Sequence, residues 1–256
     1  MDPILLMQLF TYVFLFLIGL VIGSFLNVVM HRFPRGESLI RPRSSCVQCK
    51  TILRIPDLFP VISYILLRGR CRYCGVPISL RYPLVELLTA VIIIVAYNSY
   101  GFSPQFFKYS VYFYILLVIS FIDMDKGIIP NRLVLLLLFW VMAWQLLHPN
   151  ISLTVAIFGM LAGGGLFYLI AVLSKGGMGG GDIKLMAVLG LTSGWPLVLV
   201  VFLLAFLLGA AVGLVLLIAG KKTRRDPLPF GPFLALAFFI SELWGLQIWY
   251  WYMQYI

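Results

Sequence analysis

Long apolar runs separated by short polar stretches make up most of the chain. Seven runs are roughly long enough to cross a bilayer as helices, which takes about 17 to 25 residues. They cover residues 4–30, 84–100, 107–122, 133–147, 152–173, 197–219 and 230–251. An eighth run, 183–194, would reach little more than halfway through a hydrocarbon core of ~30 Å. The pattern predicts an all-α polytopic membrane protein with about eight transmembrane helices, the eighth run forming a short one.

The first apolar run lacks the features of a cleavable signal peptide. It is longer than the apolar region of such a peptide, and no positive charge precedes it. We therefore expect residues 1–30 to form a membrane helix.

The composition excludes a soluble enzyme. Hydrophobic residues make up 62% of the chain and charged residues 11%, with a mean hydropathy of +1.04. Soluble domains carry about 25% charged residues, so an integral membrane protein is expected.

The positive charge is concentrated in particular loops. A net charge of +10 would suit a nucleic-acid partner, but its distribution favours another explanation. In an eight-helix arrangement the basic residues of the first, third, fifth and seventh loops share one side, and only Lys108 lies on the other. The positive-inside rule makes the basic side cytoplasmic, so we expect no nucleic-acid partner. The seventh loop contributes Lys221, Lys222, Arg224 and Arg225.

The one sizeable hydrophilic segment, residues 31–83, contains all four cysteines. They form two C-x-x-C pairs, Cys46 with Cys49 and Cys71 with Cys74. This spacing predicts a small cytosolic zinc-ribbon-like insertion with one structural zinc held by four thiolates. A reducing cytoplasm disfavours disulfides, and metal-free thiols remain the alternative. The chain is thus expected to divide into a first transmembrane helix (1–30), the tetracysteine segment (31–83) and a transmembrane core (84–256).

Two aspartates stand where apolar runs meet loops. Asp123 ends one run in F-I-D-M-D-K, and Asp182 follows the glycine-rich stretch G-G-M-G-G-G. Ionisable groups at membrane depth are functional candidates. Two nearby carboxylates can share the work of an aspartyl peptidase, one as base for a water and the other as proton donor. The alternative is structural, because Asp182 stands where the N-cap of the short helix is expected.

The sequence also predicts which aspartate acts as the base and which as the acid. The positive end of the short helix and the nearby Lys184 favour an ionised Asp182 as the base. Burial near Phe121 and Ile122 favours a neutral Asp123 as the acid.

Several other polar residues allow either a structural or a functional interpretation. Ser24, Asn27 and His31 share one face of the first helix, where hydrogen bonding between helices is expected more than catalysis. Glu86, near the start of the second helix, either extends to the membrane surface or binds a substrate amine. Small residues spaced by four predict close helix packing at Gly19 and Gly23, Gly159 and Gly163, and Gly209 and Gly213.

Taken together, the motifs resemble those of the type IV prepilin peptidases, polytopic membrane aspartyl proteases of the G-x-G-D type. The resemblance implies that Asp123 and Asp182 are the catalytic pair, whereas Asp125 is not catalytic. Besides the two C-x-x-C pairs, the matching stretches are G-S-F-L-N-V-V-M-H-R (23–32), R-Y-P-L-V-E (81–86), I-D-M-D-K-G-I-I-P-N (122–131), G-M-G-G-G-D-I-K-L (177–185) and P-F-G-P (229–232).

The resemblance also implies an activity and a location. Family members cut the leader peptide of prepilins or pseudopilins, whose N-terminal segment is apolar, on the cytoplasmic side of the bacterial inner membrane. Bifunctional members then methylate the new N-terminus with S-adenosylmethionine and carry a tetracysteine segment. No methyl-donor motif is legible here, so no residue is assigned to that cofactor. Asn131, where many members have an acid, resembles the competence-associated branch of Gram-positive bacteria.

Two other classes of protein fit part of the pattern. A membrane carrier or channel would use Asp123 and Asp182 to bind a cation, with the short helix lining its pathway. Carriers commonly contain internal repeats, and we find none in this sequence. A scaffold for an envelope assembly would use the zinc module as a docking surface.

Overall fold

The computed structural model describes residues 3–149, 151–223 and 226–255. In these residues the fold is α-helical, and eight helices of 14 to 30 residues match the eight predicted runs. Six of them are long and apolar enough to cross a membrane, so the chain is a multi-pass membrane protein. Arg224 and Arg225, used above for orientation, lie outside the described residues. The eight helices are α1 (Pro3–Arg32), α3 (Arg81–Tyr100), α4 (Pro104–Lys126), α5 (Asn131–Leu147), α6 (Leu153–Leu173), α7 (Gly180–Ser193), α8 (Leu197–Ile218) and α9 (Gly231–Met253).

The chain divides into two compact units, Met1–Tyr114 and Ile115–Ile256, with the boundary inside α4. We call them the first and second unit. The division predicted from the sequence, into residues 1–30, 31–83 and 84–256, stays a prediction.

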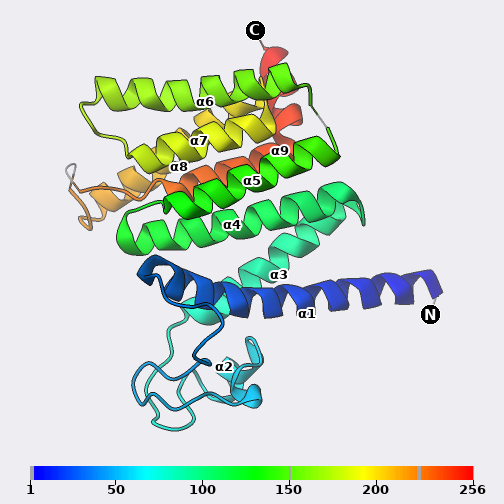
Figure 1. Cartoon of the computed structure of the whole chain (residues 1–256), viewed down its shortest axis with the longest axis vertical. Coiled ribbons are helices and arrows are strands. Elements are labelled where there is room, and N and C mark those ends of the chain that lie inside the picture. Colours follow the sequence, from blue (N-terminus) through cyan, green and yellow to red (C-terminus); the bar gives the residue numbers. More distant parts are fainter. Residues whose placement is uncertain (1–2, 150, 224–225, 256) are drawn as a thin grey trace. The chain divides into compact units, whose positions relative to one another are not determined.

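In the first unit, α1 packs closely along α3 (Figure 1). A β-carbon on Gly19 would lie 2.4 Å from the Ala90 Cα, and one on Gly23 would lie 2.6 Å from the Glu86 Cα. Only glycine leaves room for this approach, which confirms the packing role expected for this pair.

The polar segment between α1 and α3 contains little regular structure. It has the short helix α2 (Ile62–Leu66), two 3₁₀ turns (Phe33–Arg35 and Ile55–Asp57) and two isolated antiparallel bridges. Asp57 cross-links it by accepting hydrogen bonds from Arg72 Nε at 2.6 Å, the Tyr73 hydroxyl at 2.9 Å and the Arg54 N–H at 3.1 Å. Burial opposes ionisation of Asp57, but these donors outweigh it and lower its pKa. Polar contacts therefore hold this segment.

In the second unit, the short helix α7 is surrounded by other helices. It packs most extensively against α6 and also contacts α5, α8 and α9 (Figure 1). Its residues from Leu185 onward are almost all buried. A helix of 14 residues is only about 21 Å long, which is less than a hydrocarbon core of ~30 Å. Its neighbours in the protein, rather than lipid, therefore cover its apolar surface.

Candidate active site and metal centre

Asp123 lies in the last turn of α4 and is 5% exposed. Its Oδ2 accepts a hydrogen bond of 2.8 Å from the backbone N–H of Gly231, the first residue of α9. The first N–H groups of a helix have no partner within the helix and mark its positive end. A β-carbon on Gly231 would lie 3.0 Å from this same oxygen. The glycine of P-F-G-P thus lets a helix N-terminus approach the carboxylate closely.

Asp182 is the third residue of α7, and the N-cap is Gly179. The prediction that Asp182 itself caps the helix was therefore wrong, because Gly180 and Gly181 are helical. From the third position its carboxylate reaches back to the Gly179 N–H, as acids do in a capping box. A β-carbon on Gly179 would lie 2.9 Å from Asp182 Oδ2, so a side chain there would displace the carboxylate.

The structure brings Asp123 and Asp182 together within the second unit. The two carboxylates are close enough to interact electrostatically, although they lie on α4 and α7. Asp182 Oδ1 is buried and accepts no hydrogen bond within the described part of the chain. Asp125, two residues beyond Asp123, is exposed. Like charges within electrostatic range oppose one another, so ionising one of these carboxylates disfavours ionising the other.

Lys184 contacts the start of α5. Its ammonium donates a 3.0 Å hydrogen bond to Asn131 Oδ1. The sequence placed this lysine near Asp182 and did not show that its hydrogen bond goes to Asn131.

The four cysteines predicted as metal ligands come together in the first unit. The sulfur atoms of Cys46, Cys49, Cys71 and Cys74 all lie within 4.8 Å of one another, and those of Cys46 and Cys74 are 3.8 Å apart. A tetrahedral zinc with Zn–S bonds of about 2.3 Å places its sulfur ligands about 3.8 Å apart. The cluster therefore fits a metal ion of this kind.

Each C-x-x-C pair lies in the same small turn. The N–H of the first cysteine, Cys46 or Cys71, donates to a carbonyl five residues on, at 3.0 and 2.9 Å. The residue after the second cysteine has a left-handed backbone, with φ of 57° at Lys50 and 71° at Gly75. Two equivalent turns thus present two sulfur atoms each to one centre.

The thiols cannot all ionise without a cation between them. Hydrogen bonds with the Thr51 side chain and backbone lower the pKa of Cys49 to about 6. The Val76 N–H lowers the pKa of Cys74, but burial and hydrogen bonds with the other thiols outweigh it and raise it to about 11. A bound cation would remove this opposition, because metal ligation requires thiolates.

Sequence reasoning missed the Gly231 N–H as a partner of Asp123. The only signal was a glycine within P-F-G-P, which matched the family but had no assigned role. Nor did it identify the partner of Glu242, whose carboxylate accepts a 2.5 Å hydrogen bond from the Ser193 hydroxyl.

Two family models match the chain, and their matches correspond to the first and second units. The model of the family "Bacterial Peptidase A24 N-terminal domain" matches residues 17–100, and that of the "Type IV leader peptidase family" matches residues 110–214. The first match lies within the first unit, and the second lies almost entirely within the second unit. No solved structure matches the chain.

Several curated relatives cover nearly the whole chain, and those named here are all called prepilin leader peptidase/N-methyltransferase. The protein of Aeromonas hydrophila is 38% identical over 273 residues, covering 95% of this chain and 93% of its own length. That of Bacillus subtilis is 36% identical over 234 residues, covering 91% and 94%. That of Pseudomonas aeruginosa is 36% identical over 272 residues, covering 93% and 92%. These similar identities do not single out one branch, so the competence-associated branch stays a prediction. The chain belongs to the type IV leader peptidase family.

Proposed function

We propose that this protein is a membrane aspartyl endopeptidase that removes the leader peptide of type IV prepilins or pseudopilins, with Asp123 and Asp182 as its catalytic pair. The observation that carries the proposal is the convergence of two carboxylates, from α4 and α7, at the N-terminal end of α9. The names of the relatives support the substrate class.

The unequal surroundings of the two acids suggest their roles. Backbone N–H groups donate to both carboxylates, Gly231 to Asp123 and Gly179 to Asp182, so the difference lies in the free oxygen of Asp182. This unpartnered Oδ1 is free to carry the proton, so Asp182 is the acid and Asp123 is the base. This order reverses the one expected from the sequence, which did not show either feature.

In the reaction, the oxygen of a water bonds to the scissile carbonyl carbon while a water proton passes to Asp123. The proton of Asp182 moves to the carbonyl oxygen. When the C–N bond breaks, Asp123 gives its proton to the leaving nitrogen and Asp182 recovers its own. No metal or covalent intermediate takes part in these steps.

The glycine-rich turn supports access of an extended peptide to Asp182. A β-carbon on Gly181 would lie 2.8 Å from the Ile129 Cβ, whereas one on Gly180 would have no atom within 4 Å. The turn is therefore packed at Gly181 and open at Gly180. We infer that the substrate backbone approaches across Gly180, where no side chain obstructs it.

The proposal extends to the membrane, the metal and the second activity. The basic loops support a cytoplasmic position for the aspartates and the tetracysteine segment in a bacterial inner membrane. The four cysteines would hold a structural zinc. The relatives' names support N-methylation of the new N-terminus, with S-adenosylmethionine as the donor. A carrier or scaffold would have neither activity.

Cleavage of a prepilin-like peptide by the purified protein tests the peptidase proposal. Asp123→Asn and Asp182→Asn should each lower the rate by about 10³-fold or more, because each removes a group that transfers a proton. The matched control is Asp125→Asn, an exposed acid on the same helix that should cleave at nearly the normal rate. A folded Asp182→Asn protein that still cleaves well would contradict the proposal.

A further inference from the structure

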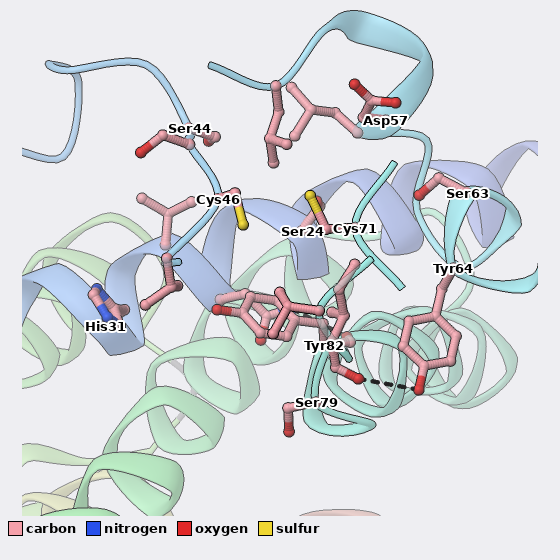
Figure 2. A pocket seen from close by; sticks show the side chains of 18 of the residues that line it. Ser24, His31, Ser44, Cys46, Asp57, Ser63, Tyr64, Cys71, Ser79 and Tyr82 are labelled. Atoms are coloured by element: carbon pink, nitrogen blue, oxygen red, sulfur yellow. Dashed lines mark hydrogen bonds between the residues drawn. The ribbon is translucent and has the colours of Figure 1, made fainter. Parts of the chain in front are cut away.

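The first unit contains a cavity of about 670 Å³ between α1, the tetracysteine segment and the start of α3 (Figure 2). This volume lies within the range of small-molecule sites. The residues that line it fall between Ser24 and Glu86, so all belong to the first unit. Figure 2 shows Cys46 and Cys71 on one side of the cavity and Tyr82 across from them. The peptidase aspartates do not line it.

One of the three acids that line the cavity has no cationic partner. Glu37 lies 3.9 Å from Arg35, and Asp57 lies 2.6 Å from Arg72. Glu86 takes part in neither of these two ion pairs.

Glu86 is 93% buried, since only 7% of its surface is exposed. Its Oε2 accepts a 2.8 Å hydrogen bond from the Val61 N–H, and the Ser24 hydroxyl lies within hydrogen-bonding reach. These contacts hold the carboxylate at the cavity wall without neutralising it. A buried carboxylate with no cation is costly, and a positively charged ligand would offset that cost.

Two tyrosines of the wall suit a flat heterocycle, and four basic residues, Arg32, Arg35, Lys50 and Arg72, also line the cavity. Tyr64 and Tyr82 both line the cavity, and the Tyr64 hydroxyl is directed to the carbonyl oxygen of Ile78 at 3.3 Å (Figure 2). Aromatic rings supply broad apolar surface for stacking, while a few fixed polar groups orient a ligand. The cavity thus combines aromatic surface with one carboxylate that lacks a cation.

We propose that this cavity binds the sulfonium methyl donor S-adenosylmethionine, with Glu86 facing its positive charge. The proposal rests on the N-methyltransferase part of the proposed function and supplies the site that the sequence left unassigned. When bound, the donor supplies a methyl carbon on a charged sulfur; transfer to an amine forms an N–C bond and breaks the C–S bond, sulfur keeping the electron pair and the amine losing a proton to solvent.

The site also links the metal centre to the second activity. Cys46 and Cys71 are the two buried cysteines, and both line the cavity. The metal would therefore hold one wall in place, and its chemistry would not enter the transfer step.

Calorimetric titration of the purified full-length protein in detergent tests this assignment without relying on methyl transfer. The wild type should bind S-adenosylmethionine saturably. Glu86→Gln should weaken that binding at least about tenfold, because it removes a charge and keeps the shape. Its affinity for S-adenosylhomocysteine, whose sulfur is neutral, should fall less than about threefold. Asp226→Asn, which removes an exposed acid that does not line the cavity, is the control and should weaken donor binding by less than about threefold.

Several results would overturn the proposal. Donor affinity unchanged in Glu86→Gln would remove Glu86 from the site, and equal losses for both sulfur compounds would remove its pairing with the sulfonium. Unchanged donor affinity with a raised KM for the peptide would assign Glu86 to the amine of the substrate instead. Bound zinc and normal peptide cleavage establish that the variant is folded. If the wild type cleaves the peptide but does not bind the donor, only this inference is wrong. If it binds the donor but does not cleave the peptide, the peptidase proposal is wrong.

Discussion

The two units hold their polar groups in opposite ways. In the second unit, Asp123 accepts one hydrogen bond from Gly231, and an oxygen of the neighbouring Asp182 accepts none among the described residues. In the first unit, Asp57 accepts three hydrogen bonds, and four thiols face one another. A carboxylate that must exchange a proton benefits from free hydrogen-bonding capacity, whereas the Asp57 carboxylate, which cross-links a loop, is saturated. The unpartnered Oδ1 of Asp182 therefore accompanies the proposed chemistry, although in the described part of the chain unpartnered buried atoms also belong to Ser110, Tyr114 and Trp144.

The units also differ in what stabilises them. The short helix α7 is buried by neighbouring helices, so packing fixes the position of Asp182. The tetracysteine segment has one five-residue helix and isolated bridges, too little regular structure to bury a substantial core. We therefore expect metal and packing perturbations to affect different activities.

Removing the metal should have the largest effect of these changes, and it should disrupt the structure of the first unit alone. Structural zinc contributes about 10–16 kcal/mol in small domains, so its loss should unfold the tetracysteine segment. Treatment with a strong chelator, or Cys71→Ser, should abolish detectable binding of S-adenosylmethionine and leave peptide cleavage within about twofold. Metal analysis should find about one zinc per untreated chain. Equal loss of both activities would contradict the separation of the units.

A packing defect in α7 should produce the opposite pattern. A β-carbon on Gly190 would lie 2.2 Å from the Gly159 carbonyl oxygen, so Gly190→Ala must push α6 and α7 apart. We expect a loss of several kcal/mol in stability and of most cleavage, with donor binding retained. Gly165→Ala, on the open side of α6, is the matched control and should behave like the wild type. Normal cleavage by Gly190→Ala would show that the close contact is not required.

The helical framework could be predicted because it depends on residue type alone. Length and continuity of the apolar runs set the helices, and the short run 183–194 indicated α7. The C-x-x-C spacing likewise predicted that Cys46, Cys49, Cys71 and Cys74 converge, since each pair needs only a local turn. Family motifs predicted Asp123 and Asp182 as a catalytic pair, which stays a prediction.

The missed features depend on backbone geometry or on tertiary packing. The donor to Asp123 is a backbone N–H of Gly231, and every residue except proline has one, so composition could not identify it. Gly179 became the N-cap because the Asp182 carboxylate reaches back to it, which requires the folded turn. The cavity beside Glu86 forms only when loops pack against α1 and α3.

A smaller effect is expected at the hydrogen bond between α9 and Asp123. In Gly231→Ala the new β-carbon would lie 3.0 Å from Asp123 Oδ2, so the carboxylate must shift and the hydrogen bond must lengthen. Hydrogen bonds to charged groups contribute about 1.5–3 kcal/mol, which predicts a fall in kcat of about 10- to 100-fold. KM should change little, because the shift acts through Asp123 rather than through substrate contacts.

The control for this prediction is Gly213→Ala in α8, where the nearest atom to a new β-carbon is 3.9 Å away. It should cleave at the normal rate. A Gly231→Ala protein whose pH–rate profile and kcat both equal those of the wild type would show that the Gly231 N–H does not position the base.

The smallest effect concerns a backbone asymmetry between the two metal turns. Lys50 and Gly75 occupy equivalent left-handed positions, with φ of 57° and 71°. That conformation costs a residue with a β-carbon about 1 kcal/mol, and glycine adopts it freely. Lys50→Gly should therefore raise the chelator concentration needed to release half of the zinc by about two- to fivefold. Gly75→Ala should lower it by a similar factor, which a zinc-release titration would measure.

Charge offers a competing explanation, because Lys50 carries a positive charge that can attract the nearby thiolates. Lys50→Ala separates the two effects, since it removes the charge but keeps the β-carbon that the left-handed backbone disfavours. If backbone strain dominates, Lys50→Ala should gain nothing and only Lys50→Gly should hold zinc more tightly. If Lys50→Ala and Lys50→Gly change the chelator concentration equally, the charge of Lys50 and not backbone strain accounts for the effect. The backbones of the two metal turns would then have similar energies.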